Sequence, residues 1–91
     1  MNVEWSDDAL VDLDRFSDFC ATPIANRVAH ETIAQAEMLG QYPRAGRSIA
    51  GREEHRQIVL QVLNARYVFQ YRYDGERLVI LRVYHGREAR E

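Results

Sequence analysis

Side chains that can transfer protons or bind anions gather near the end of this chain. Tyr84, His85 and Arg87 directly follow an apolar run, and Arg66 stands at the start of the run before it. Tyrosine and histidine can act as general acids or bases, and an arginine can stabilise phosphate or carboxylate charge. Each residue also has a structural interpretation: Arg66 could cap a sheet, Tyr84 could anchor the terminus through its ring, and His85 could simply end a strand. These four residues are the candidates for catalysis if the protein is an enzyme.

Other reactive side chains form no recognisable site. The segment Glu53–His55 looks like an acid–base cluster, but adjacent residues of a loop usually point apart. The three histidines lack the spacing of metal ligands. Cys20 has no partner histidine at a recognisable position and is expected to pack at the end of a helix. We therefore expect neither a metal nor a cofactor.

The length and composition indicate one small globular domain spanning residues 1–91. No apolar run approaches the roughly 20 residues that a membrane-spanning helix needs. The opening residues do not form a secretory signal, and a single cysteine cannot make an internal disulfide. A cytoplasmic protein without a membrane partner is the expectation.

Charge is distributed unevenly along the chain. Residues 1–40 carry eight acids and two arginines, a net charge of −6, whereas residues 41–91 carry ten arginines and six acids, a net charge of +4. Such a division could produce a polarised molecule whose basic part meets an acidic partner or nucleic acid. Alternatively, the charges could mix on the folded surface. Every basic residue is an arginine, so any mechanism that requires a lysine is excluded.

The first half of the chain predicts a short strand and two helices. Val3-Glu4-Trp5 reads as a strand, and Ser6 as the N-cap of a helix from about Asp7 to Phe19. The polar residues of that helix are expected to face water; these are Asp12, Asp14, Arg15 and Asp18. Thr22-Pro23 begins a second helix, which Gly40 ends. So short a connection predicts an antiparallel helical hairpin.

The second half predicts antiparallel strands. Ser48–Ala50 could form a short strand, Gly51–His55 a loop, and Arg56–Val62 a clear strand. The Asp74-Gly75 pair between two aromatic and β-branched runs is a strong hairpin signal. A two-residue turn would place Tyr71 opposite Leu78 and Arg72 opposite Arg77. That like-charge pair is unfavourable, so either the loop is longer or both arginines splay into solvent. The predicted fold is α+β, with an N-terminal strand and a helical hairpin on a small antiparallel sheet of three to four strands.

Taken in order, these segments resemble the RelE/ParE superfamily of toxins from bacterial type II toxin–antitoxin systems. The resemblance covers nearly the whole chain. It rests on Val3–Ser6 with the following Ala9-Leu10 and Asp12-Leu13, on Pro43–Arg47, on the strand after Arg56, on Arg66–Val68 and Tyr71, and on Ile80–Arg87. It implies a helical hairpin on a small antiparallel sheet. It also implies one of two activities: RelE-like members cut messenger RNA on the ribosome, and ParE-like members poison DNA gyrase.

The missing lysines favour the ParE-like branch. RNA cleavage through a 2′-hydroxyl needs a base, a cation and an acid. The resemblance places the lysines of RelE-like members near Gln57 and Val59, where this chain has none. Arg66 and Arg87 do fall close to arginine positions of the family, so half of a ribonuclease site is conceivable. We therefore favour no catalytic residue and expect inhibition by binding, with the ribosome-dependent endoribonuclease as the alternative.

The resemblance also implies partners. The first is a cognate antitoxin, taken to be ParD-like with a ribbon-helix-helix fold, and the second is DNA gyrase, or the ribosome with mRNA if the protein is RelE-like. The antitoxin is expected to occupy a groove between the helical hairpin and the sheet. Arg82, Arg87 and Arg90 are the residues expected to contact the antitoxin or the target. A degenerate member that binds its partner without toxicity is a third hypothesis.

Overall fold

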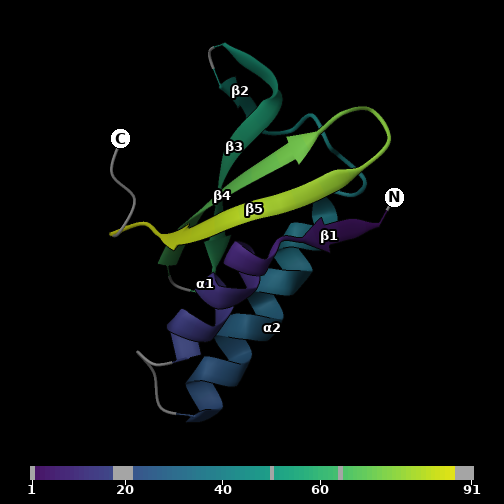
Figure 1. Cartoon of the computed structure of the whole chain (residues 1–91). Coiled ribbons are helices and arrows are strands. Elements are labelled where there is room, and N and C mark those ends of the chain that lie inside the picture. Colours follow the sequence, from purple (N-terminus) through teal and green to yellow (C-terminus); the bar gives the residue numbers. More distant parts are fainter. Residues whose placement is uncertain (1, 18–21, 50, 64, 88–91) are drawn as a thin grey trace.

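The protein is a helical hairpin packed on one face of a five-stranded mixed sheet (Figure 1). The computed structural model describes residues 2–17, 22–49, 51–63 and 65–87. The sheet order is β1-β5-β4-β3-β2. The elements in chain order are β1 (Val3–Trp5), α1 (Asp7–Ser17), α2 (Thr22–Met38), β2 (Arg47–Ile49), β3 (Arg52–Val62), β4 (Ala65–Tyr73) and β5 (Leu78–His85).

The predicted α+β class is confirmed, but the expected sheet of three to four antiparallel strands was too small. β1 pairs with β5 in parallel, with Val3 opposite Leu78 and Trp5 opposite Ile80. This pairing makes the sheet mixed and adds a strand at its edge. The predicted loop Gly51–His55 is also wrong, because Arg52 already pairs with Ile49 of β2. Gly51 makes the tight turn between these strands with a φ of 79°, a conformation that glycine adopts without strain.

The core lies between the helices and the inner face of the sheet. Alternate residues of the central strand β4 point inward, and Phe69 and Tyr71 are fully buried. On α2, Val28, Thr32 and Ala36 follow each other at helical spacing and are buried. The Thr32 hydroxyl donates to the Val28 carbonyl at 2.7 Å, so its burial leaves no unsatisfied donor.

The helix start at Ser6 is as predicted. The Ser6 Oγ accepts a hydrogen bond from the Ala9 amide at 3.0 Å, the geometry of an N-cap. α1 is described to Ser17, so the predicted end at Phe19 and the packing of Cys20 lie outside the described residues. None of the helices described here is long and apolar enough to cross a membrane.

The loop of the final hairpin has four residues instead of two. Tyr73 lies opposite Leu78, so Arg72 faces Val79 and the unfavourable pairing with Arg77 does not occur. Asp74 holds the loop, because its Oδ1 accepts the amides of Glu76 and Arg77 at 2.9 Å each. The register then shifts between Gln70 and Tyr71, which leaves Leu81 as an extra residue in β5.

The connector between α2 and β2 is fixed to the sheet by one buried hydroxyl. Tyr71 donates to the Pro43 carbonyl at 2.8 Å and accepts from the Gly46 amide at 2.9 Å. Arg56 adds a hydrogen bond to the Gly46 carbonyl at 2.7 Å. A Cβ at position 46 would lie 2.7 Å from the Tyr71 oxygen, so only glycine permits this approach.

Candidate functional site

A buried carboxylate joins the first helix to the last strand. We predicted that Asp12 would face water; instead its side chain is 1% exposed. Its Oδ2 accepts from Arg82 Nε at 2.9 Å and its Oδ1 from Arg82 Nη2 at 3.1 Å. Arg15 Nη1 donates to Oδ1 at 2.5 Å, so Arg15 is also drawn inward. The prediction failed because Asp12 lies on the same helix face as Ala9 and Leu13, and that face is covered by β5.

Side chains of α1 take the place of a neighbouring strand along the edge of β5. β1 pairs with β5 only as far as Ile80, so the outer edge of β5 is bare beyond that point. There the Val83 amide donates to Asp12 Oδ2 at 2.8 Å, and Arg15 Nη2 donates to the Val83 carbonyl at 3.3 Å. Ser6 Oγ donates to the Leu81 carbonyl at 2.9 Å. The edge groups of Leu81 and Val83, which could otherwise pair with another chain, are thereby satisfied within the molecule.

The ionisation of Asp12 follows from these contacts. Burial alone would raise the pKa of Asp12, because it disfavours the charged form. The hydrogen bonds from Arg82, from the Val83 amide and from Arg15 outweigh this, and the pKa lies below its ordinary value. Asp12 is therefore a carboxylate at neutral pH.

The four candidates for catalysis lie at one end of β4 and β5, and they are divided between the two faces of the sheet. Tyr84 and His85 are consecutive residues of β5, so they project from opposite faces of the sheet. His85 lies edge-on to the Tyr67 ring with centroids 5.1 Å apart, and its Nδ1 accepts the Arg87 amide at 3.1 Å. Tyr84 lies under the Arg82 guanidinium, 4.9 Å from ring centre to Cζ. Arg66 is exposed, and its carbonyl accepts the Gly86 amide at 2.7 Å.

The residues expected to contact a partner have different surroundings. Arg82 is held by Asp12, so it supports the fold whether or not it also touches a partner. Arg87 is exposed at the end of the described chain, and Arg90 lies outside the described residues. The roles of all three in binding stay predictions.

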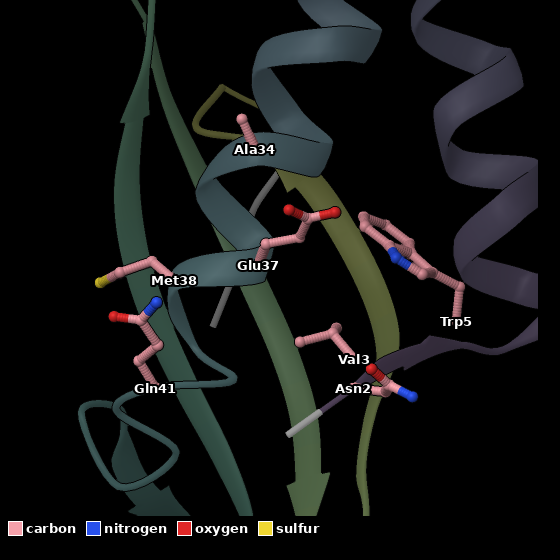
Figure 2. Close-up of a pocket in the computed structure, with 7 residues that line it drawn as sticks. All are labelled: Asn2, Val3, Trp5, Ala34, Glu37, Met38 and Gln41. Atoms are coloured by element: carbon pink, nitrogen blue, oxygen red, sulfur yellow. The ribbon is translucent and has the colours of Figure 1, made fainter.

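A hollow of about 850 Å³ lies between β1 and the last turns of α2 (Figure 2). Its lining is Asn2, Val3, Trp5, Ala34, Glu37, Met38 and Gln41. Figure 2 shows Glu37 extending from α2 toward the Trp5 ring, with Val3 below them. The hollow therefore has apolar side chains within a polar and acidic rim. It lies between the helical hairpin and the sheet, where a groove for the antitoxin was predicted, and binding of the antitoxin there stays a prediction. Its lining residues could not be predicted from sequence.

The charge asymmetry of the sequence is partly reflected in space. The helices carry exposed acids, namely Asp7, Asp8, Asp14, Glu31 and Glu37. The arginines of the second half are carried mainly by the sheet and its loops. The helices cover one face of the sheet (Figure 1). The two signs of charge nevertheless mix in places, because Arg72 pairs with Glu54 at 2.8 Å and Arg77 with Glu4 at 2.7 Å.

Comparison with known proteins identifies the class. The fold is similar to that of a solved structure described as the chromosomal ParDE TA system from P. aeruginosa. That chain is 20% identical, with a TM-score of 0.73, and the match covers 93% of this chain and 95% of that one. The family described as ParE toxin of type II toxin-antitoxin system, parDE, matches residues 3–90, and the chain belongs to this family. No curated protein matches the sequence.

Proposed function

We propose that this ParE-family toxin stops growth by binding DNA gyrase and that a cognate antitoxin neutralises it. The family membership supports the toxin, and the ParDE description of the similar structure supports an antitoxin partner. One feature favours binding over RNA cleavage: the chain has no lysine, and Tyr84 and His85 project from opposite faces of the sheet, so only one of them can face the same phosphate as Arg66. Gyrase acts in the cytoplasm, where this proposal places the protein.

The hollow beside Trp5 is the proposed anchor site of the antitoxin, which we take to be ParD-like with a ribbon-helix-helix fold. A pocket between Val3, Trp5 and Met38 accepts one or two apolar side chains of a bound segment. Glu37 at its rim suits a basic or amide neighbour in that segment.

The test is pulse labelling with thymidine and methionine, minutes after this protein alone is induced in bacteria. We expect thymidine incorporation to fall first, together with inhibition of supercoiling by purified gyrase in the presence of the purified protein. If methionine incorporation collapses first, the ribonuclease alternative replaces this proposal. Normal growth at high protein levels, with supercoiling unaffected, would instead indicate a family member that only binds its partner.

A further inference from the structure

The strands β2 and β3 form an arm that extends beyond the rest of the sheet. β3 pairs with β4 only from His55 onward, so Arg52 at its start has no partner in β4. β2 lies at the edge of the sheet, and all three of its residues are exposed. Figure 1 shows the turn between β2 and β3 at the end of the molecule opposite the helical hairpin. We call residues Arg47–Ile49 and Arg52–Arg56 the arm.

The arginines of the arm, and the one in the connector before it, lack acidic partners. Several arginines elsewhere are paired: Arg15 and Arg82 with Asp12, Arg72 with Glu54, and Arg77 with Glu4. In the part of the chain that the structure describes, no ion pair joins a carboxylate to Arg44, Arg47, Arg52 or Arg56. The Arg56 side chain donates to the Arg44 and Gly46 carbonyls, which hold it without neutralising its charge.

The arm therefore carries an excess of positive charge. Residues 44–56 contain four arginines and two glutamates, a net charge of +2. One of these glutamates, Glu54, is already held by Arg72 at 2.8 Å. The acidic residues of the helices lie toward the other end of the molecule, and salt screens charges beyond about 10 Å at 0.1 M. An anion that approaches the arm thus meets mainly arginines.

The spacing of the exposed arginines suits a regular row of anions. Ile49 pairs with Arg52 across the arm, and Arg47 lies two residues before Ile49 on the same strand. Two residues of a strand span about 7 Å. Two steps of roughly 3.4 Å along one strand of B-DNA cover the same length. Arg47 and Arg52 can therefore reach phosphates of one DNA backbone.

We propose that the arm binds the phosphate backbone of double-stranded DNA. Arg47 and Arg52 contact phosphates directly, and the exposed Ser48 hydroxyl between them can donate a hydrogen bond to a phosphate oxygen. Arg44, whose guanidinium lies 5.8 Å from the centre of the Tyr73 ring, adds a third positive charge at the side of the arm. A two-stranded ribbon fits the major groove of B-DNA, whereas the major groove of A-form RNA is too narrow for it.

An acidic protein segment fits the arm less well. Exposed ion pairs contribute little by themselves, so a protein segment also needs apolar anchors. Ile49 is the one exposed large apolar residue among the described positions of the arm. DNA needs no such anchor, because release of its counterions drives binding. Single-stranded nucleic acid is also disfavoured, because residues 47–56 contain no phenylalanine, tyrosine or tryptophan on which a base could stack.

The test is the fluorescence anisotropy of a labelled duplex of about 20 base pairs and mixed sequence. It is titrated with the purified full chain between about 50 and 200 mM salt. We expect weak binding, with a slope of log affinity against log salt concentration of about −3, since three arginines contribute about −0.9 each. A polyglutamate peptide and a single DNA strand of the same length are the comparison probes, and both should bind more weakly than the duplex.

Arg47→Ala and Arg52→Ala should each weaken duplex binding about fivefold at ~50 mM salt and make the slope shallower by about 1. Both side chains are exposed, so thermal unfolding should be unchanged. Arg66→Ala is the matched control, because Arg66 pairs with Gln61 at the other end of β3 and its loss removes the same charge. It should alter duplex binding by less than about twofold.

Three outcomes would overturn the inference: no duplex binding at ~50 mM salt, equal losses in all three variants, or tighter binding of either comparison probe. The inference goes beyond the proposed function, because the duplex is tested without gyrase or antitoxin. Failure to inhibit supercoiling would therefore contradict the proposed function alone, and failure to bind the duplex would contradict the DNA contact alone.

Discussion

Arg82 donates two hydrogen bonds to the Asp12 carboxylate, at 2.9 and 3.1 Å, although the two residues are 70 positions apart in the sequence. The same carboxylate also accepts a hydrogen bond from the Val83 amide. The Asp12 side chain therefore holds both the backbone of β5 at Val83 and the side chain of Arg82. The pair connects the helical layer to the strand that carries Tyr84 and His85. Loss of this pair should therefore lower the free energy of unfolding of the whole domain.

Asp12→Asn should destabilise the protein by about 2–4 kcal/mol. Asparagine keeps the shape but removes the charge that holds two arginines, and breaking a buried pair typically costs about 3–5 kcal/mol, here reduced because Arg82 is partly exposed. Urea unfolding followed by circular dichroism measures the change. Asp14→Asn, an exposed position two residues along the same helix, is the control and should stay within about 0.5 kcal/mol. Equal effects of the two substitutions would contradict a special role for Asp12.

The free energy of unfolding should depend on pH in part through the ionisation of Asp12. Its folded-state pKa is lowered, so its contribution is present above the ordinary value of 3.8 and is lost as pH falls through the lower folded value. Glu4 and Asp74 also have lowered pKa values, so the wild-type curve alone cannot isolate Asp12. The difference in unfolding free energy between wild type and Asp12→Asn should be largest at neutral pH. It should shrink as the pH falls, because a protonated Asp12 resembles asparagine. A difference independent of pH would refute this assignment.

Tyr71→Phe should destabilise by about 1–3 kcal/mol, because it leaves the buried Gly46 amide and the Pro43 carbonyl without their hydroxyl partner. Tyr42→Phe serves as the matched control, since Tyr42 is 60% exposed. Thermal or urea unfolding measures both variants. In addition, hydrogen exchange at Gly46 should accelerate in Tyr71→Phe only; unchanged protection there would show that Arg56 alone fixes the connector.

Ala34→Arg should weaken antitoxin binding by at least about tenfold, because a long cationic side chain would fill the hollow beside Trp5. Ala34 is exposed, so the fold should tolerate the change. Glu31→Arg introduces the same residue one turn earlier, outside the hollow lining, and should alter affinity less than about twofold. Calorimetric titration with the cognate antitoxin measures the affinity. Equal losses of affinity in both variants would show that the antitoxin does not bind in the hollow.

Local patterns predicted the helices and most strands. The cap at Ser6, the stop near Gly40 and the run Arg56–Val62 each depend on neighbouring residues alone, and each was confirmed. The final hairpin also lies where it was predicted, but its two strands pair in a different register. The unfavourable Arg72–Arg77 pairing pointed to a longer loop, whereas nothing local predicts the extra residue at Leu81.

Long-range partners account for what the sequence could not predict. Asp12 looked like a solvent-facing residue because its charge suggested water, and only the fold brings Arg82 and the Val83 amide beside it. A helical stripe of Ala9, Asp12 and Leu13 was the one available signal that this carboxylate faces inward. The hollow beside Trp5 likewise combines residues from the chain start and from α2, which no spacing rule connects.

The pairing of the first strand with the last also sets the order of events during synthesis. Among the described elements β1 leaves the ribosome before all others, yet its neighbour in the sheet is β5, which is made after the other described strands. Asp12 likewise lacks its partner Arg82 until β5 has been synthesised. A nascent chain that lacks β5 therefore has an unpaired first strand and an uncovered first helix, and it must avoid aggregation until translation ends. A premature stop before Leu78 would remove β5 and leave β1 and β4 without their common neighbour, so it would yield an incomplete sheet instead of a shorter toxin.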